Sequence, residues 1–324
     1  MSAKDRGYRA PPWLPGGHAQ TIYASLLPRP EVRYRRERFE TPDGDFVDFD
    51  WLETGATHAP LVVLFHGLEG DSSSHYSRAL MLKVKTMGWQ GVVPHFRGCS
   101  GEPNRLPRAY HSGDYSEVEW MLSTIHARMP HATIFAAGVS LGGSALLNWI
   151  GRKSTQAAAI LTAAAAVSTP LDLSAAGFAI GQGLNRIYSR HFLGTLVPKA
   201  MAMARRFPGT LDELMIRRVG SMYAFDEMVT APLHGFSGAE DYWSRASSKP
   251  WLKDIRLPTL VLNAKNDPFI PANSLPGPKE VGPGVLLEQP AHGGHGGFPA
   301  APFPGRLDWL PARLVSFFSS FEGE

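Results

Sequence analysis

Short apolar runs alternate along much of the chain with longer segments of mixed character. Residues 61–65, 91–96 and 158–167 are mainly apolar, which is typical of strands buried on both faces of a parallel sheet. Between these runs, residues 74–87 and 114–129 place apolar side chains at helical spacing. The alternation predicts an α/β protein with a mostly parallel central sheet, flanked by helices and joined by right-handed crossovers.

Other strand patterns precede and follow this region. Residues 32–40 and 45–53 alternate between apolar and charged positions around a Pro-Asp-Gly turn, which predicts an antiparallel hairpin. The rhythm of strand and helix resumes at residues 258–263 and 285–288. An amphipathic helix at residues 309–321 is expected to close the fold.

Two regions lack this alternation. The first thirty residues are rich in proline and glycine, which predicts an irregular lead-in rather than a core element. The middle of the chain carries helical patterns at residues 183–192, 198–207 and 211–219 without a clear strand between them, and we interpret it as an inserted helical cap. The chain therefore divides into the lead-in (1–30), the first part of an α/β core (31–171), the cap (172–248) and the second part of the core (249–324).

Composition narrows the possible partners and compartments. The 324 residues are 44% hydrophobic and 19% charged, which is enough to form a large core. The net charge is only +3 and no block of lysine and arginine occurs, so we expect no nucleic-acid partner. A single cysteine, Cys99, excludes an intrachain disulfide and fits a reducing compartment.

The sequence shows neither a signal-peptide pattern nor a membrane-spanning run. Residues 1–8 lack the apolar segment of a signal peptide. The longest apolar run, residues 157–167, is too short to cross a bilayer. We therefore expect a cytoplasmic protein without an integral membrane segment.

The motif that stands out is Gly138-Val139-Ser140-Leu141-Gly142. It follows an apolar run at residues 133–137 and precedes a helix-forming run at residues 144–150. The pattern G-x-S-x-G between a strand and a helix is typical of a nucleophile elbow, in which glycines allow the strand and the helix to approach closely. The pentapeptide alone can arise by chance among 33 glycines, but its position favours Ser140 as a catalytic nucleophile.

A serine nucleophile needs a base and an orienting carboxylate, which in this arrangement follow later strands in the order acid, then histidine. Asp267 follows the strand at residues 258–263 and is the preferred acid. The alternative is that Asp267 only forms a turn before a proline. Asp172 and Asp254 are weaker candidates because neither directly follows a buried strand.

Two histidines compete for the role of base. His295 has glycines on both sides and is preferred over His292, because such a loop can bring the ring over the serine. The spacing H-x-x-H also allows a zinc interpretation, but a zinc site needs at least a third ligand and normally a helix to space the ligands, so this interpretation is the weaker one. We therefore expect neither a metal nor another cofactor.

The tetrahedral intermediate needs two donors for its oxyanion. The backbone N–H of Leu141, directly after the nucleophile, is one candidate. The loop after the first parallel strand should supply the other, and we assign it to the N–H of Leu68. The side chain of His66 in this loop is interpreted as a buried structural histidine.

Together these motifs resemble the YheT-like branch of the α/β-hydrolase superfamily, bacterial hydrolases related to eukaryotic lipid hydrolases. The matching segments are residues 16–21 (GGHAQT), 66–70 (HGLEG), 96–101 (FRGCSG), 110–114 (YHSGD), 138–143 (GVSLGG), 225–227 (FDE), 232–236 (PLHGF), 266–269 (NDPF) and 293–298 (GGHGGF). The resemblance implies an α/β-hydrolase fold and a triad of Ser140, Asp267 and His295. His95 departs from the pattern, in which an asparagine precedes the Phe-Arg-Gly.

The expected activity is hydrolysis of a small-molecule carboxylic ester through an acyl-enzyme intermediate. Because the lead-in has no apolar anchor, we expect a soluble ester rather than a bilayer lipid. The cap is expected to form a pocket for an apolar acyl group, although the same residues could instead pack the cap itself. The candidate lining residues are Phe178, Ile180, Ile187, Tyr188 and Phe192. An acyltransferase using the same triad and a non-catalytic ligand-binding protein are the alternatives.

Overall fold

A central sheet organises the molecule. The computed structural model describes residues 7–55 and 59–322, so residues 1–6 of the expected lead-in lie outside the described residues. In this described part, eight strands form one sheet in the order β1-β2-β4-β3-β5-β6-β7-β8. The strands are β1 (Tyr34–Glu40), β2 (Phe46–Leu52), β3 (Leu61–Phe65), β4 (Gln90–Pro94), β5 (Ile134–Val139), β6 (Ala163–Val167), β7 (Thr259–Leu262) and β8 (Val285–Glu288).

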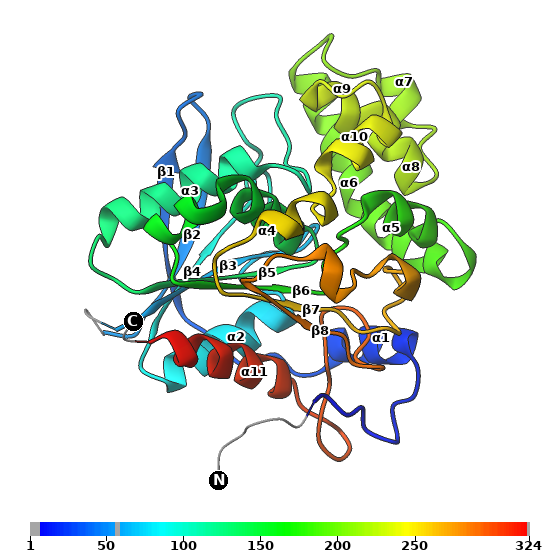
Figure 1. Cartoon of the computed structure of the whole chain (residues 1–324). Helices are drawn as coiled ribbons and strands as arrows, with labels where there is room; N and C mark the ends of the chain where they lie inside the picture. The colour runs from blue at the N-terminus through cyan, green and yellow to red at the C-terminus, as the bar shows by residue number, and fades with distance from the viewer. Residues whose placement is uncertain (1–6, 56–58, 323–324) are drawn as a thin grey trace.

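The strand directions confirm the predicted fold class. β1 and β2 form the expected antiparallel hairpin, and β2 runs antiparallel to β4. The remaining neighbours are all parallel. In Figure 1, α3 (Tyr115–Arg128) and α4 (Leu141–Lys153) cover one face of the sheet, whereas α2 (His75–Thr86) and α11 (Trp309–Phe318) cover the other.

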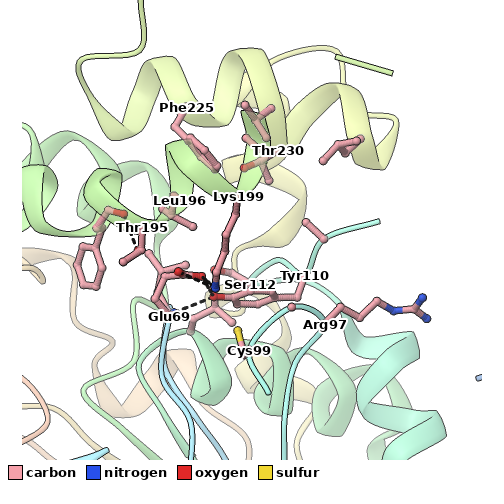
Figure 2. Close-up of a pocket in the computed structure, with 18 of the residues that line it drawn as sticks. Glu69, Arg97, Cys99, Tyr110, Ser112, Thr195, Leu196, Lys199, Phe225 and Thr230 are labelled. Atoms are coloured by element: carbon pink, nitrogen blue, oxygen red, sulfur yellow. Dashed lines mark hydrogen bonds and ion pairs between the residues drawn. The ribbon is translucent and has the colours of Figure 1, made fainter. Parts of the chain in front are cut away.

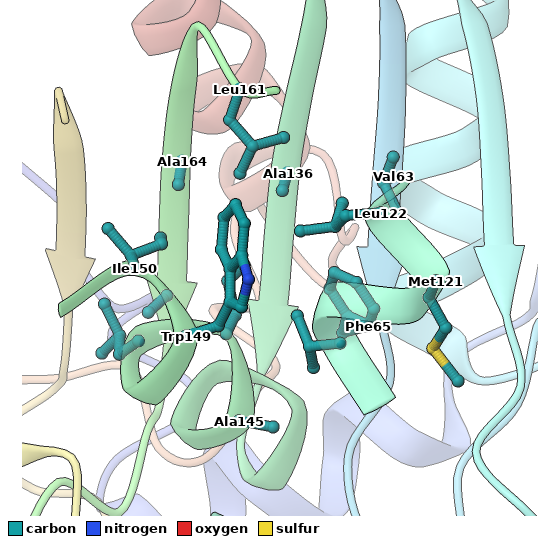
Figure 3. Close-up of a cluster of buried hydrophobic side chains, with 14 of the residues drawn as sticks. Val63, Phe65, Met121, Leu122, Ala136, Ala145, Trp149, Ile150, Leu161 and Ala164 are labelled. Atoms are coloured by element: carbon teal, nitrogen blue, oxygen red, sulfur yellow. The ribbon is translucent and has the colours of Figure 1, made fainter. Parts of the chain in front are cut away.

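The core beneath α4 depends on small residues in the sheet. Figure 3 shows Trp149 of α4 lying over Ala136 of β5 and Ala164 of β6. Alanines leave room for the indole, which is only 1% exposed, and burial of so large a side chain stabilises the fold by roughly 3 kcal/mol or more. The indole N–H donates to Glu119 Oε2 at 2.8 Å, so its polar atom is satisfied. This packing anchors the helix that begins directly after Ser140.

The start of β6 differs from the prediction. The strand begins at Ala163, and residues Ser154–Ala159 form a 3-10 helix instead of the expected strand from residue 158. Alanine-rich sequence carries little strand preference of its own, and alanine is the better helix former. The apolar run therefore could not mark where the strand begins.

The helices between β6 and β7, which we call the cap, lie above one end of the sheet (Figure 1). They are α5 (Leu173–Ile180), α6 (Arg186–Arg206), α7 (Glu213–Ile216), α8 (Met222–Phe225), α9 (Ala231–His234) and α10 (Ala239–Ala246). The prediction of two helices at residues 183–192 and 198–207 is wrong, because α6 continues through Pro198. Proline normally interrupts a helix by crowding the carbonyl four residues earlier. Here buried Leu193, Leu196 and Ala200 lie on both sides of Pro198 and pack α6 against the other helices of the cap.

The lead-in also differs from the prediction, because it contains helix α1 (Gly17–Leu26). Gln20 and Ala24 on this helix are fully buried. The helix is therefore part of the packed structure rather than an irregular tail. Among the described residues, no helix is both long and apolar enough to cross a membrane.

Candidate active site

The turn between β5 and α4 holds Ser140 in a strained conformation. Its φ and ψ are 54° and −121°, in the left-handed region that costs a residue with a side chain about 1–3 kcal/mol. The Ser140 N–H donates to Val167 O at 2.9 Å, which fixes the turn against β6. A side chain at Gly142 would collide with the carbonyl oxygens of Phe65 and His66. Glycine is therefore required for β3 and α4 to approach this closely.

Three side chains from distant parts of the chain meet at this turn. His295 Nε2 lies 3.0 Å from Ser140 Oγ, and His295 Nδ1 lies 2.8 Å from Asp267 Oδ2. The Asp267 carboxylate is fully buried and its other oxygen accepts the N–H of Phe269 at 2.8 Å. The Phe269 ring packs over His295 at 4.2 Å between centroids. This geometry allows the imidazole to exchange a proton with the serine while the carboxylate orients it.

The competing candidates lie in other environments. Asp172 accepts the N–H of Ala175 and caps α5, and Asp254 ends a short 3-10 helix. The exposed His292 contacts the Asn266 side chain at 3.4 Å. No group of three or more histidine, cysteine or acidic side chains within the described residues has the geometry of a metal site.

The loop after β3 passes close to Ser140, because a Cβ at Gly67 would lie 3.2 Å from the Ser140 Cβ. The Gly67 N–H donates to Tyr76 Oη at 2.8 Å and the Glu69 N–H donates to Tyr110 Oη at 2.7 Å. Within the described part of the chain, neither the N–H of Leu68 nor that of Leu141 donates a hydrogen bond to another residue. Leu141 is the first residue of α4, where helical N–H groups lack an intrahelical partner. Both residues line the same cavity as Ser140, so both N–H groups remain the candidates for binding an oxyanion.

The side chain of His66 controls the orientation of this loop. Its Nδ1 lies 2.8 Å from Gly67 O, and its Nε2 accepts the N–H of Phe96 at 3.0 Å. Nδ1 therefore carries the proton, and burial, aided by His95, lowers the pKa of His66 to about 3. The Gly67 carbonyl is thereby turned inward. In a trans peptide the following N–H points the opposite way, so the Leu68 N–H is directed away from His66.

A cavity of about 760 Å³ lies over Ser140, between the sheet and the cap. Of the five residues expected to form its wall, Ile180 and Phe192 line it. Phe178 and Ile187 are half exposed outside the wall, and Tyr188 lies behind Phe269, where its hydroxyl contacts His18. On α6, cavity-lining positions recur about every fourth residue, and Ile187 falls on another face. The further apolar wall residues from the cap include Leu196, Met203, Met222, Phe225, Val229 and Leu233.

Sequence reasoning missed the contribution of α1. Thr21 Oγ1 accepts the N–H of His295 at 2.9 Å, and Gln20 Oε1 accepts the N–H of Gly293 at 2.9 Å and the side-chain amide of Asn266 at 3.0 Å. The first helix therefore holds the loop that carries the base. The motif at residues 16–21 was the available signal, but its partners lie more than 240 residues further along the chain.

The comparison with known families agrees with this architecture. Residues 60–302 match the family model described as the alpha/beta hydrolase fold. The chain belongs to the α/β-hydrolase family. The esterase Pf2001 of Pyrococcus furiosus has the same fold, with a TM-score of 0.58 at 15% identity, covering 90% of this chain and 92% of that one.

Relatives of this α/β-hydrolase confirm the resemblance to the YheT-like branch. The Escherichia coli K12 protein YheT, which carries the name of an esterase, is 37% identical over 94% of this chain and 90% of its own length. A human protein named Phospholipase ABHD3 is 29% identical, covering 94% of this chain and 76% of its own. Both alignments extend well beyond the elbow motif.

Proposed function

We propose that the protein is a serine hydrolase that cleaves carboxylic esters through Ser140, His295 and Asp267. The observation that carries the proposal is the continuous path from Asp267 Oδ2 to His295 to Ser140 Oγ, with contacts of 2.8 and 3.0 Å. The esterase and phospholipase names of the relatives support an ester substrate. The serine, the imidazole and the carboxylate are the groups that acyl transfer requires.

The reaction divides into acylation and deacylation. As Ser140 Oγ bonds to the ester carbonyl carbon, its proton moves to His295 Nε2 and the carbonyl oxygen becomes an oxyanion. The N–H groups of Leu68 and Leu141 stabilise that charge. When the intermediate collapses, the C–O bond to the alcohol breaks and His295 returns the proton to the leaving oxygen. Water activated by His295 then attacks the acyl-enzyme and frees Ser140.

The cavity wall supports an ester with an apolar acyl group. Side chains such as Leu196, Met203 and Phe225 line the space above the serine. Transfer of a hydrocarbon chain from water to such a wall contributes about 0.8 kcal/mol for each buried CH₂ group. The acyl chain is therefore assigned to the cap side of the cavity.

The test is covalent labelling combined with turnover. A fluorophosphonate probe should label the wild-type protein, and p-nitrophenyl butyrate should be hydrolysed. Ser140→Ala should abolish both, whereas the control Ser320→Ala, an exposed serine near the end of the chain, should retain both. Labelling that survives in Ser140→Ala would contradict the assignment. Acyl transfer to an added alcohol in preference to water would instead identify an acyltransferase.

A further inference from the structure

An ion pair joins the cap to the loop that carries the Leu68 N–H. Lys199 Nζ of α6 lies 2.9 Å from Glu69 Oε1 and 2.8 Å from Glu69 Oε2. In Figure 2, the Lys199 side chain extends from the cap helix down to Glu69, directly beside the ring of Tyr110. The Glu69 side chain is 9% exposed and that of Lys199 is 47% exposed. The carboxylate is thus the enclosed partner, and the ammonium reaches it from above.

The Glu69 carboxylate is fixed in place beside the cavity. Glu69 has a φ of 55°, and its N–H donates to Tyr110 Oη at 2.7 Å. The Tyr110 hydroxyl in turn donates to Glu69 Oε1 at 3.1 Å. Both the backbone and the side chain of Glu69 are therefore bound to one tyrosine, so the carboxylate is not free to turn toward solvent.

The other titratable neighbours do not balance this negative charge. Burial raises the pKa of Tyr110 well above its usual value, and burial raises the pKa of Cys99 to about 12. Both side chains are therefore neutral at neutral pH and bring no positive charge to this site. Arg97, the other cation labelled in Figure 2, pairs with Asp43, Asp45 and Glu117 instead. Lys199 is therefore the cation paired with Glu69.

The position of this charge matters for the reaction. Glu69 directly follows Leu68, and both residues line the cavity that contains Ser140 and His295. A bare carboxylate at this point would oppose the negative charge that develops on the oxyanion, because Coulomb interactions are weakly screened in an enclosed site. An ion pair with one half-exposed partner contributes little to stability, so a purely structural role explains this placement poorly.

We propose that Lys199 is a positioning residue that acts through Glu69. Its ammonium neutralises the Glu69 carboxylate beside the oxyanion hole and holds the loop 66–70 against the cap. The inference rests on the proposed function, since it concerns the stabilisation of an acyl-transfer intermediate. It also makes the rate of acylation depend on where α6 lies above the loop.

The test compares charge variants on p-nitrophenyl butyrate. Lys199→Met should lower kcat by about tenfold or more with little change in KM, because it removes transition-state stabilisation. Lys199→Arg should restore most of the rate. Glu69→Gln should lower kcat less than Lys199→Met does, and the double variant Glu69→Gln/Lys199→Met should regain much of the lost rate, since the unpaired charge is gone.

A matched control and a count of active sites complete the design. Arg205→Met removes another cation of α6, one that pairs with Glu213 outside the cavity wall, and should leave kcat as in the wild type. Titration with the fluorophosphonate probe measures the concentration of folded, active protein, and each kcat is calculated from that concentration. The inference is overturned if Lys199→Met keeps the wild-type kcat, or if the double variant stays as slow as Lys199→Met. A wild-type protein without ester turnover would contradict the proposed function instead.

Discussion

The backbone N–H of His295 donates a hydrogen bond to Thr21 Oγ1 at 2.9 Å, across 274 residues of sequence. The Thr21 hydroxyl in turn donates to Gly17 O at 2.7 Å, so its remaining lone pairs face the histidine loop. Gly294 and Gly296 on either side of His295 have positive φ values, and such a loop has little rigidity of its own. Helix α1 supplies the restraint that the glycines do not.

Replacement of Thr21 by valine should therefore impair chemistry more than substrate binding. Valine keeps the shape of threonine but accepts no hydrogen bond, so the His295 N–H loses its partner and the imidazole its fixed position. We expect kcat on p-nitrophenyl butyrate to fall by about tenfold or more. KM should change by less than about twofold, because the substitution leaves the cavity above Ser140 intact. Steady-state kinetics with active-site titration measure both quantities.

Two further variants separate positioning from general damage to α1. Thr21→Ser retains a hydroxyl and should recover most of the rate. Ile22→Ala changes the neighbouring residue of α1, which is 44% exposed, and should behave as the wild type. Equal kcat values for Thr21→Val and Thr21→Ser would show that the hydroxyl does not position His295.

Local patterns were sufficient to identify the central strands, apart from where β6 begins, and the turn at Ser140. The apolar runs at β3 and β5 mark strands because both faces of the central sheet are covered, and the glycines around Ser140 mark the turn because backbones approach there. Chain order indicated Asp267, and the flanking glycines favoured His295 over His292. The structure places Asp267 and His295 within hydrogen-bond distance. These features are local in sequence or follow from the order of strands.

Contacts between segments that are distant in the sequence could not be predicted from local patterns. The buried side of α1 includes Gln20, a polar residue whose role is to accept hydrogen bonds from residues 266 and 293. Hydrophobic periodicity does not identify a buried polar side chain such as this one. Likewise, which face of α6 borders the cavity depends on how the cap sits over the sheet. The sequence pattern therefore does not distinguish Phe192, which lines the cavity, from Ile187, which does not.

The cavity wall leads to an expectation about chain length. For the wild type, kcat/KM on p-nitrophenyl esters should rise by up to about fourfold for each added CH₂, which corresponds to roughly 0.8 kcal/mol, until the cavity is filled. Leu196 is 7% exposed and lines the cavity from α6. Leu196→Trp should fill part of this space, so that activity on the acetate persists and the gain for longer chains is lost.

The matched control for Leu196→Trp lies on the same helix. Ile187→Trp introduces an equally large side chain at a position that is 58% exposed and outside the cavity wall, so its profile of rate against chain length should follow the wild type. If both tryptophan variants lose the long-chain preference, the cavity above Ser140 is not the acyl site. A wild-type kcat/KM that does not rise with acyl chain length would also show that the cavity above Ser140 is not the acyl site.

The carboxyl group of Asp226, in the cap, should make stability depend on pH. Asp226 borders the cavity and accepts hydrogen bonds from Thr230 Oγ1 at 2.7 Å and from Trp243 Nε1 at 2.8 Å. Despite these bonds, burial raises the pKa of Asp226 from 3.8 to about 6. The folded state therefore binds a proton more tightly than the unfolded state does. The contribution of Asp226 becomes less favourable as pH rises from 3.8 to about 6, and the loss reaches up to about 3 kcal/mol above that window.

Asp226→Asn should remove this pH dependence, because the amide is uncharged at every pH and its oxygen and nitrogen can still bond to Trp243 and Thr230. We expect the free energy of unfolding of the wild type, relative to the variant, to decline between pH 4 and 7, as measured by urea denaturation at a series of pH values. The difference between the two proteins cancels the titration of all other groups that the substitution leaves unperturbed. A difference that stays constant with pH would show that folding leaves the pKa of Asp226 unchanged. A difference that grows in favour of the wild type at neutral pH would show that the cap stabilises the Asp226 carboxylate.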